Sequence, residues 1–353
     1  MPDLLQIAPL PLATQGLPLL VGQIKTQPED FEVEEIPAYI PSGVGEFLYL
    51  WVEKKGLSGP FLAKALSRDL KVSPKEIGMA GFKDRHAVTR QWISLPARVE
   101  MALANLNLPG FRILQTARHG NKLRTGHLHG NRFKVLLRTQ DPDASQKMAR
   151  LLEKLKQTGL RNFYGEQRFG KGQETLAGGL GLVLGIPGPR MPGHLLKLAY
   201  SAVQSALFNE VLRERINLEI ERKVIPGDVL AFLPQEKCCS AVDLERDQVR
   251  VNQGAMAITG PMPGWKMHPS PQEEALVLEQ RVIGQFGFTP ECWRQAGRFM
   301  TGARRPLSYP LSDIQWEKEV EGIRLSFTLP AGTYATQLLR EIREPDENNQ
   351  GEY

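Results

Sequence analysis

The chain has 353 residues, of which 41% are apolar and 24% charged, enough for two domains of ordinary size with buried cores. This composition excludes an intrinsically disordered chain. Three cysteines are too few for a disulfide framework and suit a reducing compartment. No apolar run reaches the roughly 20 residues that span a bilayer, and the N-terminus lacks the order of a signal peptide, so we expect a cytoplasmic protein.

The first half of the chain alternates short strand-like and helix-like segments. Residues 31–36 alternate apolar and acidic side chains, as a half-buried strand does, and residues 47–54 are apolar on both faces, which predicts a strand between two layers. Leucines at helical spacing after Ser58 predict a helix, and residues 73–76 form a capping box with proline at the first helical position. We therefore expect Asp84 to lie on a loop between this short helix and the next strand.

The loop sequence AGFKDRHAVTRQ, residues 80–91, places Asp84 between Lys83 and Arg85. Nearby positive charge favours the ionised form of a carboxylate, which a nucleophile or a general base requires at neutral pH. Gly81 is expected to give the loop the backbone freedom that brings this carboxylate close to a substrate. The alternative is an exposed turn whose local ion pairs contribute little.

The formal net charge of +5 is modest, but it is unevenly distributed. Residues 110–138, the basic strip, contain no acidic residue and carry these cations: Arg112, Arg118, Lys122, Arg124, Arg132, Lys134 and Arg138. Such a strip is typical of a surface that contacts backbone phosphates, because each neutralised phosphate releases counterions. A solvated surface is the alternative. Residues 341–353 are acidic instead, and we expect them to form a solvated, frayed terminus.

The end of the basic strip offers candidate nucleotide contacts. His127 and His129 alternate, but no third ligand stands at a recognisable spacing, so we reject a metal site. Asn131 opens a strand predicted at residues 132–138, and its amide supplies a donor and an acceptor for the edge of a nucleobase. Phe31 could likewise stack on a base, although most phenylalanines that open a strand belong to the core.

The composition of the chain changes between about residues 165 and 310, where glycine and proline are dense and one long helical pattern covers residues 195–216. Strand-like alternation resumes only at residues 323–329, so the middle block predicts an inserted second domain. After that strand, Pro330 and Gly332 predict a tight turn, and Tyr334 enters a helix with its ring free near the turn.

Five ordered stretches carry a resemblance to a known family: PEDFEVEE (28–35), GFKDRHAVTRQ (81–91), GNRFKVLLR (130–138), NFYGEQRFG (162–170) and LPAGTYATQLLRE (329–341). With them the chain resembles the TruD family of tRNA pseudouridine synthases along nearly its whole length. The resemblance implies an α+β fold, with a catalytic domain of mixed sheet and helices built from residues 1–160 and 308–353, and an inserted α/β domain of residues 161–307. It also implies an isomerase that acts on uridine 13 of tRNA without a cofactor, a metal or an obligate protein partner.

The resemblance assigns roles residue by residue. Asp84 matches the family's catalytic aspartate, and Phe31 and Asn131 match residues that hold the target nucleotide. Tyr334 stands where the family usually has phenylalanine, which keeps a stacking face and adds a hydroxyl. The expected substrate contacts, by match or by position in these motifs, are Lys25, Phe31, Lys83, Asn131, Phe133 and Tyr334.

Formation of pseudouridine breaks the bond from uracil N1 to the ribose, turns the base and joins its C5 to the same sugar carbon, with no redox step. The uridine must first be flipped out of the tRNA stack, at a cost of a few kcal/mol that aromatic stacking and edge hydrogen bonds recover. Asp84 then attacks the sugar carbon or base C6, or removes a ribose proton. The sequence does not decide among these three routes.

Two other functions agree with part of the sequence. A non-catalytic RNA-binding protein would use the same basic strip, but it would have no use for an aspartate that faces phosphates. A metal-dependent nuclease would need clustered carboxylates for Mg²⁺, and the sequence shows none.

Overall fold

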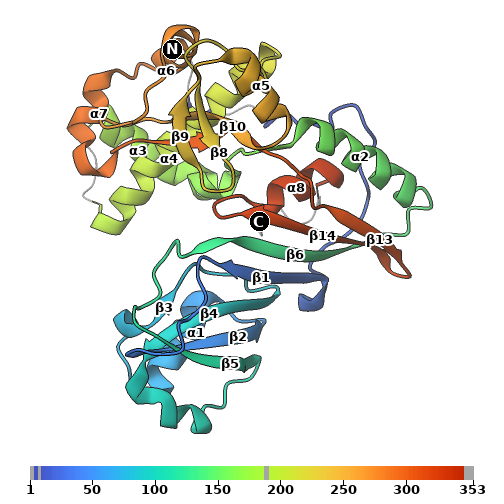
Figure 1. Cartoon of the computed structure of the whole chain (residues 1–353), viewed down its shortest axis with the longest axis vertical. Helices are drawn as coiled ribbons and strands as arrows, with labels where there is room; N and C mark the ends of the chain where they lie inside the picture. The colour runs from blue at the N-terminus through green and yellow to red at the C-terminus, as the bar shows by residue number, and fades with distance from the viewer. Residues whose placement is uncertain (1–3, 7–8, 187–190, 346–353) are drawn as a thin grey trace.

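The computed structural model describes residues 4–6, 9–186 and 191–345, and its elements form two groups (Figure 1). One group contains a large sheet with helices, and the other contains a smaller sheet surrounded by helices. Segments from both halves of the chain meet in the first group, because residues 322–330 pair with residues 130–138 across the middle of the molecule.

The large sheet has eight strands: β1 (Phe31–Pro37), β2 (Phe47–Lys55), β3 (Gly78–Met79), β4 (Val88–Pro96), β5 (Phe111–His119), β6 (Leu128–Arg138), β13 (Gln315–Glu319) and β14 (Gly322–Pro330). Their order is β13-β14-β6-β1-β4-β2-β5, and β3 pairs with β4. β1 and β4 are parallel and the other pairs antiparallel, so the sheet is mixed. The strands predicted at 31–36, 47–54, 132–138 and 323–329 are confirmed.

One face of this sheet, the inner face, carries both core and polar side chains. Phe31, Val33 and Glu35 of β1 are buried and point to this face, because side chains two residues apart on a strand share a face. The register sets Val33 opposite Phe133 and Glu35 opposite Asn131, so these two side chains of β6 lie on the inner face as well.

Three helices cover the large sheet. α1 (Gly59–Asp69) begins after Ser58, as the sequence predicts. The Ser58 hydroxyl accepts a hydrogen bond from the Phe61 N–H, and the helix packs on β2. α2 (Ala144–Thr158) and α8 (Ala335–Ile342) share a core with β6 and β14. The capping box at residues 73–76 is present, but it begins only a single 3-10 turn. The 3-10 helices of this group are η1 (Pro28–Asp30), η2 (Pro74–Glu76) and η3 (Ala97–Asn105).

The second group contains a four-stranded sheet of β8 (Val229–Phe232), β9 (Lys237–Ser240), β10 (Met256–Met262) and β11 (Ala303–Pro306), in the order β11-β10-β8-β9. Its helices are α3 (Glu174–Val183), α4 (Gly193–Asn217), α5 (Leu244–Asn252), α6 (Glu273–Gln285), α7 (Pro290–Ala296), η4 (Glu166–Phe169), η5 (Lys171–Gln173) and η6 (Gly297–Phe299). α4 is the long helix that the sequence predicts. None of the described helices, α4 included, has the length and apolarity needed to cross a membrane.

A two-stranded pair, β7 (Leu160–Arg161) with β12 (Ser308–Tyr309), stands where the chain passes between the groups. It lies next to the predicted domain boundaries at residues 160 and 308. Those boundaries stay a prediction. All strands of the large sheet lie outside residues 161–307, and all strands of the four-stranded sheet lie within them.

The expectation of a frayed acidic terminus is wrong at Glu341. Its carboxylate is buried and accepts hydrogen bonds from the backbone N–H groups of Ala13 and Thr14 at 3.1 and 3.0 Å. α8 is thereby tied to the N-terminal segment. Residues 346–353 lie outside the described residues.

Candidate active site

Asp84 lies on a loop, residues 80–87, as the sequence predicts, although the loop runs from the unpredicted two-residue strand β3 to β4. Its side chain is 37% exposed, and its Oδ2 forms an ion pair with the Lys25 ammonium, while Oδ1 accepts a hydrogen bond from the His86 backbone N–H at 3.2 Å. Burial by itself would raise the pKa of Asp84, but Lys25 and the backbone N–H donors outweigh burial and hold this pKa below its usual value. The carboxylate is therefore ionised at neutral pH and still reachable from solvent.

The cations next to Asp84 in the sequence do not supply this charge. Lys83 turns into the sheet, where its ammonium lies 2.8 Å from Glu35 Oε2, and both side chains are buried. Arg85 contributes its backbone N–H. The expectation that Lys83 keeps Asp84 charged is therefore wrong, because the loop directs Lys83 toward Glu35, and Arg85 helps through its backbone N–H. A contact between Lys83 and a substrate would require that buried pair to break.

The unusual backbone at the site belongs to Lys25 and not to Gly81. Gly81 adopts no left-handed φ, and a Cβ there would meet no atom within 4 Å, so the expected need for glycine is wrong. Lys25 has a φ of +58°, a conformation that is costly for a non-glycine residue and persists where its surroundings impose it. The bridge between Gln23 and Arg138 fixes the chain just before this turn. The turn directs the Lys25 ammonium to the loop.

The rings of Phe31 and Phe133 contact each other on the inner face, next to the ion pair of Lys25 and Asp84. Phe31 is 4% exposed and meets Phe133 edge-to-face with ring centroids 6.1 Å apart, and Phe133 stacks on Phe327 at 5.1 Å. The Lys25 ammonium lies 4.6 Å from the centroid of the Phe31 ring and covers it. Both phenylalanines belong to the core here, and a base reaches the Phe31 ring only when Lys25 moves aside.

Asn131 lies on the inner face between Glu35 of β1 and Leu329 of β14. Its Oδ1 atom is buried and has no hydrogen-bond partner among the described residues. A buried acceptor left unsatisfied costs about 1–3 kcal/mol, so its presence calls for an explanation such as a ligand or a water that completes it. An N–H group of a base is a suitable donor.

Tyr334 precedes α8, at the end of the turn that follows β14. The residue is 39% exposed, and its ring meets that of Tyr164 edge-to-face, with centroids 6.2 Å apart. The Arg305 guanidinium of β11 lies 4.2 Å from the centroid of the Tyr164 ring and donates to the Gly332 carbonyl at 3.0 Å. Residues of the second group therefore hold the turn that presents Tyr334.

The contacts above and a shared sheet face bring together five of the predicted site residues: Lys25, Phe31, Asp84, Asn131 and Phe133. The turn before Tyr334 is bound to β6, the strand that carries Asn131 and Phe133. The Ala331 backbone N–H of the turn donates to the His129 carbonyl of β6 at 3.0 Å. Lys83 contacts the inner face through its buried pair with Glu35, which lies opposite Asn131.

Lys54 was not among the predicted site residues, yet it lies beneath the loop. Its side chain is 1% exposed, and its ammonium donates at 2.6, 3.3 and 2.8 Å to the backbone carbonyls of Leu57, Lys83 and Asp84. It continues the buried alternation of β2, which runs through Leu48, Leu50 and Val52. A lysine in phase with three buried apolar residues is a sequence signal that could have identified it.

Among the described residues, four of the seven cations of the basic strip form ion pairs, three of them at the surface and one, Arg138, with the buried Asp30. Ion pairs join four of its arginines to acidic residues of other segments: Arg112 to Glu53, Arg118 to Glu100, Arg132 to Glu34 and Arg138 to Asp30. Because these partners come from elsewhere in the chain, the positive field of the strip is weaker than the sequence suggests.

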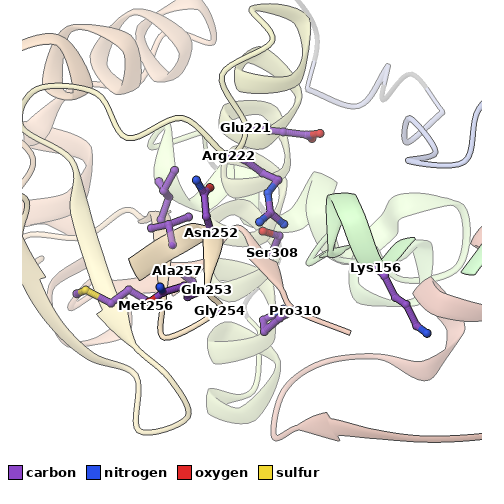
Figure 2. A pocket seen from close by; sticks show the side chains of 12 residues that line it. Lys156, Glu221, Arg222, Asn252, Gln253, Gly254, Met256, Ala257, Ser308 and Pro310 are labelled. Atoms are coloured by element: carbon purple, nitrogen blue, oxygen red, sulfur yellow. The ribbon is translucent and has the colours of Figure 1, made fainter. Parts of the chain in front are cut away.

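Two other features lie apart from this site. The pocket in Figure 2 is near the β7–β12 pair, and its polar lining includes Lys156, Glu221, Arg222, Asn252 and Ser308, none of them a predicted site residue.

His127, one of the two alternating histidines rejected above as metal ligands, contacts a tyrosine: its Nδ1 lies 2.8 Å from the Tyr39 hydroxyl. Within the described ranges, no three His, Cys, Asp or Glu side chains gather as ligands of a metal would.

The amino-acid sequence matches the family model of tRNA pseudouridine synthase D (TruD) over residues 12–180 and 189–342. Two similar curated proteins bear the name tRNA pseudouridine synthase D. That of Thermus thermophilus is 40% identical over 336 residues, covering 94% of this chain and 91% of the relative. That of Syntrophotalea carbinolica is 35% identical over 396 residues, covering 94% and 98%.

The fold is similar to that of a solved structure from Methanosarcina mazei that bears the same family name. The TM-score is 0.76 at 22% identity, over 96% of this chain and 97% of that chain, which confirms the α+β fold that the resemblance implies. The family model and the curated relatives show that the chain belongs to the TruD family of tRNA pseudouridine synthases, which are isomerases.

Proposed function

We propose that the chain converts a uridine of tRNA to pseudouridine with Asp84 as the essential carboxylate, and that the uridine is at position 13, as the family resemblance implies. The observation that carries the proposal is the ionised, partly exposed Asp84, held by Lys25 beside the inner face of the sheet. A general base or nucleophile must be unprotonated and within reach of its substrate, and Asp84 meets both conditions.

The surrounding residues supply contacts for a flipped uridine. The unpaired Oδ1 of Asn131 accepts from an N–H group of uracil, which ends the cost of leaving that atom unsatisfied. The exposed ring of Tyr334 offers a stacking face. Lys25 is released from the Phe31 ring as the base enters, which frees that ring for a second stacking contact.

The isomerisation conserves every atom of the uridine. The bond from the ribose to N1 breaks with its electron pair on the base, the same sugar carbon bonds to C5, and the proton lost from C5 is balanced by a proton gained at N1. Attack of Asp84 on the sugar carbon, attack on C6, and removal of a ribose proton all begin with an ionised carboxylate. In each route the Lys25 ammonium is a nearby cation that stabilises negative charge developing on the base.

The proposal assigns residues 1–160 and 308–353 to the catalytic domain and residues 161–307 to an inserted domain. Contacts of Tyr164 and Arg305 with the turn before α8 support a role for the inserted segment in one wall of the site. Because the substrate is tRNA, we place the protein in the cytoplasm.

The test is a map of pseudouridine in total tRNA from cells with and without the gene. We expect one tRNA position to lose pseudouridine in the deletion strain and to regain it with a plasmid copy. Purified protein should then modify an unmodified transcript, with or without EDTA, and should fail on the same transcript with cytidine at position 13. An unchanged map and an inactive pure protein would contradict the proposal, and activity abolished by EDTA would favour a metal-dependent enzyme.

A further inference from the structure

The loop that carries Asp84 is tethered by polar side chains from three neighbouring strands. Lys54 of β2 donates to three backbone carbonyls, two of them in the loop. Glu35 of β1 pairs with Lys83, and Gln91 of β4 donates to another loop carbonyl at 3.3 Å. All of these side chains are buried, so the sheet beneath the loop determines where its backbone lies.

Lys54 matches its three acceptors only as an ammonium. An ammonium has three N–H donors, and the three carbonyls at 2.6, 3.3 and 2.8 Å take one each. A neutral amine has two donors and a lone pair, which would face one carbonyl oxygen and leave it unsatisfied. Loss of the proton therefore removes one of the tethers of the loop.

The charged groups that face Lys54 come from the loop above it. Burial lowers the pKa of Lys54 to about 8, while Asp84 raises it and Lys83 lowers it. Lys83 is itself paired with Glu35 from β1, and Asp84 with Lys25 from the N-terminal segment. Lys54 thus changes protonation in a pH range where activity can be measured.

We propose that Lys54 is a positioning residue of the reaction, which in its ammonium form fixes the backbone of residues 83 and 84 and so sets where the Asp84 carboxylate meets the nucleotide. The inference rests on the proposed function, because it takes Asp84 as the essential carboxylate. Lys54 is buried beneath the loop and acts through Asp84. A displacement of about 1 Å at a reacting group can cost about 100-fold in rate, so the effect should appear in the rate and not in tRNA binding.

The test compares Lys54→Met with Lys55→Met in the full chain. Methionine approximates the length of lysine without its donors, and Lys55 is the exposed neighbour, paired with Glu29 at the surface. We expect Lys54→Met to lower the single-turnover rate constant, measured with enzyme in excess over tRNA, by about 100-fold, with the Kd for tRNA unchanged. Lys55→Met should retain the wild-type rate.

The pH profile separates positioning from a purely structural role. The wild-type rate should fall as the pH rises through about 8, because Lys54 loses its proton. Lys54→Arg, which stays charged, and Lys54→Met should both lack this alkaline limb, and Lys54→Arg should retain the higher rate. A limb that persists in both variants would belong to another group and would overturn the proposal. If Lys54→Met does not fold, the profile of Lys54→Arg decides alone.

Asp84→Asn, measured in parallel, keeps the two proposals distinguishable. An active Asp84→Asn variant would remove the role proposed for Asp84 and this inference together, while the isomerisation itself would stand. An active wild-type protein whose rate and profile are unchanged in Lys54→Met would remove only the role of Lys54.

Discussion

The Asp84 loop and the basic strip both bring lysines and arginines close to carboxylates, but they do so at different depths. At the loop, both Lys83 and Lys54, which lies beneath it on β2, are buried, and their ammonium groups donate hydrogen bonds to backbone carbonyls and to one carboxylate. In the strip, Arg112 and Arg132 pair at the exposed surface. Breaking a buried pair is costly, whereas an exposed pair contributes little. Buried lysines therefore fix the position of the loop backbone, whereas the exposed arginines of the strip contribute only a positive potential that their acidic partners and solvent screen.

The sharpest test of this difference uses two neighbouring residues of β1. Glu35→Gln leaves the Lys83 ammonium buried without a countercharge, so we expect a loss of about 3–5 kcal/mol in the free energy of unfolding, measured by urea denaturation. Glu34→Gln is the matched control, because its partners Arg90 and Arg132 are partly exposed, and it should cost at most about 1 kcal/mol. Equal losses of unfolding free energy in the two variants would mean that the buried pair stabilises the protein no more than the exposed pair does.

Removal of the cation at Asp84 should affect rate and pH dependence together. In Lys25→Met, the ammonium that lowers the pKa of Asp84 is lost while burial remains, so this pKa rises above that of the wild type and less of the carboxyl group is ionised at a given pH. We expect a loss of roughly 100-fold in kcat at neutral pH and an acid limb of the rate profile at higher pH than in the wild type. An acid limb that stays in place would show that Lys25 does not control the charge of Asp84.

The smallest effect is expected from the basic strip. Neutralising Arg118, Lys122 and Arg124 together should weaken tRNA binding modestly and flatten its salt dependence, by about 0.9 in the log–log slope for each lost phosphate contact. Arg118 is already paired with Glu100, so it contributes less than an unpaired cation would. A variant that neutralises Arg150 and Lys154 on α2 is the control. An unchanged slope in the triple variant would assign the strip to solubility.

The sequence predicted those elements whose side chains alternate or recur in phase. β1, β6 and β14 follow from alternation, α1 from its leucines and Ser58, and the place of Asp84 on a loop from the elements around it. These features depend on neighbours along the chain, which a single sequence displays directly.

The partners of the charged groups could not be predicted, because strand register and one left-handed turn decide them. Lys25 reaches Asp84 across 59 positions through a backbone conformation that its sequence does not favour. Lys54 and Glu35 each continue the buried phase of a strand with a charged residue, which is a sequence signal for a buried charge. The sequence did not show their partners Lys83 and Asp84, because these lie on the loop that the fold places above them. The acidic partners of the basic strip were hidden for the same reason.

The central claim is that an ionised Asp84 carries out the isomerisation, and Asp84→Asn tests it most directly. The amide keeps the shape of the carboxylate but loses its charge, so the variant should bind tRNA as the wild type does and form no detectable pseudouridine in a single-turnover assay. Pseudouridine formed at the wild-type rate by this variant would contradict the account.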